Sequence, residues 1–339
     1  MNTFLITVMF FSLIVFVHEF GHFIFARLFK VAVHEFSIGM GPAIWKTKKS
    51  ETVYSLRMIP IGGFCKMEGE DEKSESENSF NKKSWYKRCI ILIAGGLMNI
   101  LLGFVMCCAM VLCQKNISSV IVDRVELNSP IENFLQSGDK IVKINNSKIH
   151  IKRDIEFEFS KIGADDYYDL TINRRGKTIV KSVKPNVYEF GNNNFTCVGF
   201  IPKILKINLF NLIREGFYLT FWAIKLVLIS IKMLISGALN LNEMSGVVGA
   251  ANMLGKAAKT GIVDLLFLSS FISINIGLFN LLPFPALDGG RVLFIIIELI
   301  RRKPIKAEHE GIVHFIGFAL FILLMIFATW NDITRIFLH

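Results

Sequence analysis

The sequence has little charge for its length and contains no paired cysteine motif. Charged residues make up 19% of the 339 residues, and the six cysteines include no CxxC pair. Disulfides and a cysteine-ligated metal are therefore not expected. The net charge of +10 is not accompanied by any stretch that interleaves basic and aromatic residues, so a nucleic-acid partner is not expected either. The first apolar run lacks the positive start and small-residue cleavage site of a signal peptide, and we expect it to remain as a membrane span.

Long uncharged runs occupy both ends of the chain, and 52% of all residues are hydrophobic. A membrane helix needs about 20 apolar residues, and four segments qualify: about 4–25, 90–113, 265–285 and 311–329. A fifth, about 216–235, contains Lys225 and Lys232, and we expect it to lie along the outer interface with its lysines reaching water. These runs predict a polytopic α-helical membrane protein with about four spans, in contact with the lipid bilayer.

Basic residues gather in two loops between the expected spans. One loop runs from Arg27 to Arg88, and the other begins at Arg291 after the third span. Cytoplasmic loops carry an excess of lysine and arginine, so both loops are expected to be cytoplasmic. Both chain termini and the polar middle block are then expected on the periplasmic side of a cell inner membrane.

The polar stretches predict local structure of two kinds. Residues 53–67 have the pattern of a hairpin, and the acidic stretch 68–79 that of a solvated linker. In the middle block, Gly138-Asp139 and Arg175-Gly176 supply turns. Strands are expected at 120–125, 140–144 and 168–172, with a helix near 155–162. We therefore expect an N-terminal membrane region (1–113), a small β-rich domain (117–200) and a C-terminal membrane region (208–339).

The stretch His18-Glu19-Phe20-Gly21-His22 is an HExxH motif within the first expected span. Residues four apart lie on one face of a helix, so both imidazoles can bind one ion. Glu19 then lies within reach of a metal-bound water. Tetrahedral zinc needs a third protein ligand and an open position for that water. Three titratable groups within one span are energetically costly, which favours a metal site over an interhelical hydrogen-bond cluster.

Asp288 has the most distinctive surroundings of the acidic residues in the later apolar runs. Pro283 and Pro285 interrupt a helix before it, and Gly289-Gly290 follow it. Irregular backbone at membrane depth is tolerated only inside protein or beside a cavity. A catalytic ligand would have to lie in such a place, so Asp288 is the candidate third ligand.

Other titratable groups near the apolar runs are expected to have simpler roles. His314, at the start of the last span, is expected to be a hydrogen-bonding histidine rather than a metal ligand. Asp264, Glu298 and Asp332 are expected at membrane interfaces.

Together these motifs resemble the site-2 protease family of intramembrane zinc metalloproteases, and in particular the bacterial regulator of sigma-E protease type. The middle block is similar to a PDZ domain, although the best-known relatives of this type carry two and this chain has room for one. A clear Gly-Leu-Gly-Phe carboxylate-binding loop is not evident. Further matching stretches are Gly63–Glu70 (membrane-associated hairpin), Ala94–Asn99 (second span), and Ser245–Gly249 and Asn331–Ile333 (C-terminal half).

The resemblance implies one zinc ion per chain and a set of site residues. Glu19 would act as general base. Asn280 matches a residue that holds the substrate backbone, and the hairpin would pair with an unwound substrate strand. The implied zinc ligands are His18, His22 and Asp288, and the implied substrate-binding residues are Asn280, Gly62, Gly63 and Phe64.

The implied activity is hydrolysis of peptide bonds within or near the transmembrane helices of single-pass proteins, such as an anti-sigma factor or remnant signal peptides. One alternative is a non-proteolytic membrane adaptor with a PDZ-like module and an inert zinc site. Glu19 argues against it, because zinc binding alone does not need this carboxylate. A second alternative is an ion transporter, since His, Glu and Asp within membranes also line ion pathways.

Overall fold

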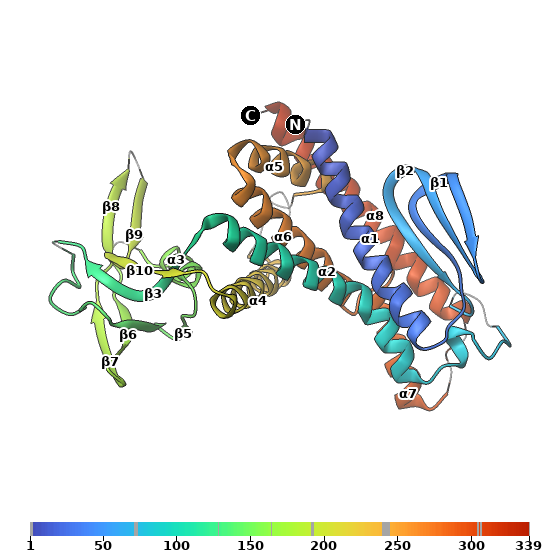
Figure 1. Ribbon diagram of the computed structural model, residues 1–339, viewed down its shortest axis with the longest axis horizontal. Helices are drawn as coiled ribbons and strands as arrows, with labels where there is room; N and C mark the ends of the chain where they lie inside the picture. The colour runs from blue at the N-terminus through green and yellow to red at the C-terminus, as the bar shows by residue number, and fades with distance from the viewer. Residues whose placement is uncertain are drawn as a thin grey trace. The chain divides into compact units, whose positions relative to one another are not determined.

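The computed structural model describes residues 3–70, 74–127, 129–163, 165–190, 193–238, 245–303, 305 and 307–338 (Figure 1). The chain divides into two compact units. One contains Met1–Met106 and Ala223–His339, and the other contains Cys107–Trp222.

The helices carry most of the hydrophobic sequence. Five are long and apolar enough to cross a membrane: α1 (Thr3–Leu28), α2 (Trp85–Gln114), α4 (Leu209–Ile235), α6 (Ile262–Asn280) and α8 (Ala307–Leu338). The sequence predicted about four spans, and α4, which contains the doubtful segment 216–235, is the additional candidate. Its interfacial position stays a prediction. Two shorter helices, α5 (Val247–Thr260) and α7 (Asp288–Arg301), also belong to the first unit.

Helix α6 ends at Asn280, earlier than the apolar run that it occupies. Pro283 and Pro285 explain this end, because proline lacks a backbone N–H and restricts the residue before it. The irregular stretch 281–287 then joins α6 to α7, whose first residue is Asp288. The candidate third ligand therefore stands at a helix start, directly after a break within the apolar sequence.

Strands β1 (Val33–Lys49) and β2 (Thr52–Met67) form the sheet of the first unit, which lies against α1. Each long strand folds back on the other. Residues 33–38 pair with 63–67, and residues 35–38 also pair with 53–56. Residues 43–49 and 52–57 pair with each other and form the hairpin. Apolar side chains of the sheet, Phe36 among them, pack with Phe16 and Phe23 of α1. This packing brings residues 63–67 alongside the HExxH helix.

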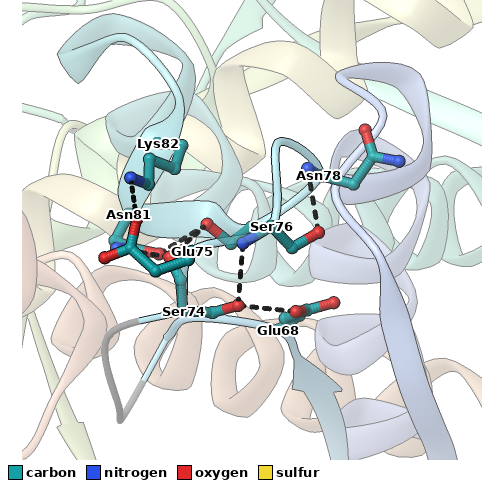
Figure 2. Close-up of polar contacts among 8 residues, drawn as sticks. Glu68, Ser74, Glu75, Ser76, Asn78, Asn81 and Lys82 are labelled. Carbon is teal, nitrogen blue, oxygen red and sulfur yellow. Dashed lines mark hydrogen bonds and ion pairs between the residues drawn. The ribbon is translucent and has the colours of Figure 1, made fainter.

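The acidic stretch after β2 differs from the solvated linker expected over 68–79. In its described part, the Ser74 hydroxyl donates to the Glu68 carboxylate at 2.6 Å (Figure 2). The Phe80 N–H donates to the Glu68 carbonyl. Ser79 is fully buried. Residues 71–73 of the stretch lie outside the described residues. Serine and asparagine side chains satisfy backbone groups locally here, which an estimate from net polarity alone misses.

The second unit contains a sheet with strand order β10-β3-β4-β6-β7, and β5 pairs with β4. Its elements are β3 (Asn116–Val125), β4 (Lys140–Ile144), β5 (Ser147–Lys148), α3 (Lys152–Phe159), β6 (Tyr168–Arg174), β7 (Lys177–Val183), β8 (Asn186–Phe190), β9 (Asn193–Cys197) and β10 (Phe200–Lys206). The three predicted strands lie in β3, β4 and β6, and the predicted helix overlaps α3. This β-rich unit is consistent with an inserted PDZ-like domain.

A buried ion pair stabilises the second unit. Asp139 is 1% exposed and accepts hydrogen bonds from Arg174 Nε at 2.8 Å and Nη2 at 2.7 Å. Burial alone would raise the pKa of Asp139, but its bonds with Arg174 and the Gln136 amide outweigh that effect and hold the pKa below its usual range. The pair fixes the predicted Gly138-Asp139 turn against β6.

Candidate metal centre

Three metal-binding side chains converge in the first unit. His18 and His22 come from the C-terminal half of α1, and Asp288 comes from the first turn of α7. The two Nε2 atoms are 3.2 Å apart, and Asp288 Oδ2 lies 3.2 Å from that of His18 and 3.4 Å from that of His22. The structure thus brings together the three residues that the sequence proposed as ligands, from segments about 270 positions apart in the chain.

Helix α2 orients both imidazoles. His22 Nδ1 donates to the Ile91 carbonyl at 2.9 Å, which leaves its Nε2 lone pair free. The side-chain amide of Asn99 lies 3.4 Å from His18 Nδ1. Asn99 is fully buried, and its side-chain oxygen otherwise has no hydrogen-bond partner among the described residues. When this oxygen accepts the Nδ1 proton of His18, the lone pair of His18 Nε2 is free to bind a metal. Such partners are what metal-binding histidines require.

These three atoms fit a zinc ion. Zinc bonds of 2.0–2.2 Å in a tetrahedron place neighbouring ligand atoms about 3.3–3.6 Å apart, which is close to the spacing found. Asp288 Oδ2 is buried without a hydrogen-bond partner among the described residues. Three electron-pair donors that face one another at this distance repel unless a cation lies among them. The donor set and its spacing are therefore those of a zinc site with one position left for water.

Glu19 lines a cavity of about 380 Å³ together with the three candidate ligands. The Cys65 backbone amide hydrogen-bonds to Glu19. A Cβ on Gly63 would come 3.5 Å from Glu19 Cγ, so the strand segment passes directly beside the carboxylate. In β-sheet pairing, residues 63–67 have 33–38 on one side, and Phe64 on this segment lines the same cavity.

Charged residues stand at another part of this cavity. Lys66, Glu70 and Arg291 line it, and Arg291 Nη1 donates to Glu70 Oε1 at 2.5 Å. Arg291 lies one turn after Asp288 on α7, and Glu70 lies just beyond the end of β2. The ion pair therefore joins the ligand-bearing helix to the sheet beside the HExxH motif.

The remaining sequence-proposed residues have varied positions. Gly62 has φ +90° and packs against the side chain of Met40. Asn280 is the last residue of α6 and is half-buried. Within the described part of the chain, Gly62, Gly63 and Asn280 are not among the residues that line the zinc cavity. Their roles in substrate binding stay predictions.

The structure adds functional neighbours that the sequence reasoning missed. Asn99 is one: it ends the stretch Ala94–Asn99 that resembles the family's second span and is an amide within an apolar run, but no role was predicted for it. Glu298 and Asp332, both expected at membrane interfaces, have specific partners. Glu298 accepts a hydrogen bond from Arg88 at 3.2 Å. Asp332 accepts from the N–H groups of Gly246 and Gly249 at 2.8 and 2.7 Å, and so caps the start of α5.

A second cavity, of about 630 Å³, lies within the β-rich unit between α3 and the β9–β10 connection. The stretch Cys197-Val198-Gly199-Phe200 lines it. The sequence reasoning found no Gly-Leu-Gly-Phe loop, and this stretch retains the apolar-Gly-Phe part of such a loop. Ile155 and Phe159 of α3 form the apolar side of the groove.

Comparison with known proteins agrees with the geometry. The model of peptidase family M50 matches residues 6–324. The chain is 37% identical over 330 residues to a protein of Clostridium acetobutylicum with a provisional zinc-metalloprotease name, covering 97% of this chain and 96% of that protein. It is 31% identical over 422 aligned positions to the regulator of sigma-W protease RasP of Bacillus subtilis, covering 99% of each. The zinc metalloprotease RasP of Bacillus licheniformis is 30% identical, covering 100% of each. With its apolar helices and its converging metal-binding side chains, the chain belongs to peptidase family M50, the site-2 protease family, and is a multi-pass membrane zinc metalloprotease.

Proposed function

We propose that this chain is an intramembrane endopeptidase that hydrolyses peptide bonds within or near the transmembrane helices of single-pass proteins. The observation that carries the proposal is the cavity in which Glu19 stands beside the His18, His22 and Asp288 side chains, alongside the strand segment 63–67. A non-proteolytic adaptor would need neither a carboxylate at that position nor a strand beside it. The activity follows from the placement of these groups together.

The proposed ligands are His18, His22 and Asp288, and a zinc ion held by them would supply a water of lowered pKa and polarise the scissile carbonyl. The Glu19 carboxylate, which lines the cavity, is placed to take the proton of the attacking water and to return it to the leaving amine. The Cys65 amide, hydrogen-bonded to Glu19, keeps the carboxylate aimed into the cavity. Burial of the site strengthens each of these electrostatic interactions.

The strand segment 63–67 supports a proposal for substrate binding. A peptide bond within a helix is hydrogen-bonded and shielded, so cleavage requires local unwinding. Pairing with the strand supplies the unwound backbone with new hydrogen-bond partners. Phe64 lines the cavity, and Gly63 allows the segment to approach Glu19. We propose that Gly62 gives this segment its turn and that Asn280 holds the opposite side of the substrate backbone.

The substrate class is proposed from the family. One relative is named as a regulator of sigma-W protease, and we extend this to single-pass substrates of the same kind, an anti-sigma factor or a remnant signal peptide. We further propose the division into membrane regions 1–113 and 208–339 with a PDZ-like domain at 117–200 on the outer side. Cys113, exposed at the end of α2, is a native reporter: an impermeant thiol reagent should label it from outside intact cells. Labelling only after lysis would reverse the proposed orientation.

Glu19→Gln tests the chemistry. The variant should keep stoichiometric zinc, because the ligands remain, and lose about 10²–10⁴-fold in cleavage of a model transmembrane substrate, because the base is gone. Glu51→Gln, an exposed carboxylate at the β1–β2 turn, is the matched control and should cleave normally. Cleavage by Glu19→Gln at the wild-type rate would exclude this base. A wild-type enzyme that holds zinc but cleaves nothing would favour the adaptor, and ion flux without cleavage the transporter.

A further inference from the structure

The turn that carries Asp288 into the metal centre contains an unusual backbone conformation. Ala286 has φ +75°, in the left-handed region that side chains other than glycine seldom adopt. It lies two residues before Asp288 and lines the zinc cavity. The Phe284 and Leu287 N–H groups bond within the turn, Pro283 and Pro285 have no N–H to donate, and the Ala286 N–H bonds outside the turn. Where the carboxylate lies thus depends on what holds Ala286.

His314 of α8 provides a partner for this turn. The Ala286 N–H donates to His314 Nδ1 at 2.9 Å. An Nδ1 that accepts must be unprotonated, so the ring proton is on Nε2, which is buried and 3.8 Å from Glu310 Oε1. The ring also lies 5.4 Å from that of Phe294 on α7. His314 therefore contacts both the turn and the helix that follows it.

The residue one helical turn after His314 also lets α8 contact the turn that carries Asp288. Gly317 lies one turn further along α8, and a Cβ there would come 2.3 Å from Pro285 Cβ. Only glycine allows the turn to approach α8 this closely. The turn thus contacts α8 through Pro285 and Ala286, and the Asp288 carboxylate just after it lies against His18 and His22 of α1.

We infer that His314 is a positioning residue for the metal centre: its Nδ1 holds Ala286 in the left-handed conformation that directs Asp288 toward His18 and His22. The inference rests on the proposed role of Asp288 as a zinc ligand. It assigns His314 an action on zinc through the backbone rather than by coordination. Without the acceptor, Ala286 relaxes toward the extended region and the carboxylate moves away from the two imidazoles.

Two substitutions of His314 separate this role from general packing. Asparagine places its side-chain oxygen where Nδ1 stands and keeps the acceptor, whereas leucine fills the space without one. The zinc dissociation constant of the full-length enzyme in detergent is measured by competition with a chelator. We expect His314→Leu to weaken zinc binding by about 10–100-fold, the usual effect of losing a group that orients a ligand, and His314→Asn to stay near the wild-type value. His309→Leu, at an exposed histidine of the same helix, is the matched control and should not change zinc binding.

Equal zinc affinity of His314→Leu and wild type would overturn the inference, as would an equal loss in both His314 variants or in His309→Leu. Asp288→Asn is measured in parallel. If it retains zinc, the proposed ligand set fails, whereas loss in Asp288→Asn without loss in His314→Leu refutes only the positioning role. Ala286→Gly in the His314→Leu background should recover part of the affinity, because glycine adopts the left-handed conformation without strain. A further loss in that double variant would also contradict the inference.

Discussion

The metal centre requires glycine at position 95 of α2, because a side chain there would collide with both histidines. A Cβ at this position would lie 2.4 Å from His22 Nε2 and 2.8 Å from His18 Cε1. Ordinary contact distances are about 3.5–4.0 Å, so Gly95→Ala would push the His22 ring back by about 1 Å. Metal–ligand distances tolerate only about ±0.2 Å. The substitution should therefore separate the imidazoles from Asp288 even though it adds a single methyl group.

The expected loss in zinc affinity is at least about 100-fold, or about 2.7 kcal/mol. Helix propensity works in the other direction, since alanine is favoured over glycine by up to about 1 kcal/mol in a helix. A loss thus cannot come from weakening α2 itself. Zinc content is measured on purified protein, followed by chelator competition and cleavage of a transmembrane substrate.

Gly103→Ala is the matched control on the same helix. Its Cβ would also meet a neighbour at 2.4 Å, but that neighbour is the Ile274 side chain. Overpacking there should cost about 1–3 kcal/mol of stability and leave zinc in place. If Gly95→Ala holds zinc as tightly as wild type, the histidines do not bind the ion against this face of α2, and the reasoning is refuted.

Three further predictions follow from side-chain partners. Arg291→Glu should reduce cleavage about 10-fold by facing Glu70 with a like charge, and exchanging the two charges should restore most of the rate in the same assay; no recovery would mean that the pair is not coupled. Asp139→Asn should destabilise the β-rich unit by about 1–3 kcal/mol, seen as faster hydrogen exchange in β4 and β6. Because the folded-state pKa of Asp139 is held down by Arg174, its stabilisation is present at neutral pH and is lost as the pH falls below about 4 and through the lower folded pKa; the variant should lack this acid-dependent part, and an unchanged acid profile would contradict the assignment. Asp332→Leu should free the start of α5 and raise exchange of its first amides by about 10-fold, a cost of about 1–2 kcal/mol; unchanged exchange would show that the cap contributes nothing.

The sequence by itself determined that this is a membrane protein with a metal-binding motif, because the patterns that indicate both are local. Apolar runs define spans by length alone, and the spacing of His18 and His22 places them on one face of any helix. Three strands of the β-rich unit, β3, β4 and β6, were predicted from alternation and turn residues, and β5 and β7 to β10 were not. Asp288 could be proposed because prolines and glycines around it break a helix where the chain is otherwise apolar.

Two features were predicted less well from the sequence: hydrogen bonding within a polar stretch, and whether a helix with a few charges is apolar enough to span a membrane. The acidic stretch after β2 has the composition of a linker, yet Ser74 donates to the Glu68 carboxylate, and Ser79 and Asn81 donate to the Ser74 carbonyl. Segment 216–235 contains two lysines and was set apart from the spans, while α4 as a whole passes the same length and apolarity test as the other four. Composition averages over a window and does not register which backbone groups find partners.

Tertiary structure alone decided which distant groups meet. Asn99 reaches His18 because small residues of α2 let it pack closely on α1. His314 and Asp288 are 26 positions apart in the sequence, and only the approach of α8 to the turn puts an imidazole nitrogen against the N–H of Ala286. Such contacts depend on how helices pack, and helix packing is set by the shapes of many side chains at once. The motifs could therefore supply the metal-binding groups, and the packing of α2 against α1 and of α8 against the turn before α7 fixed where each of them points.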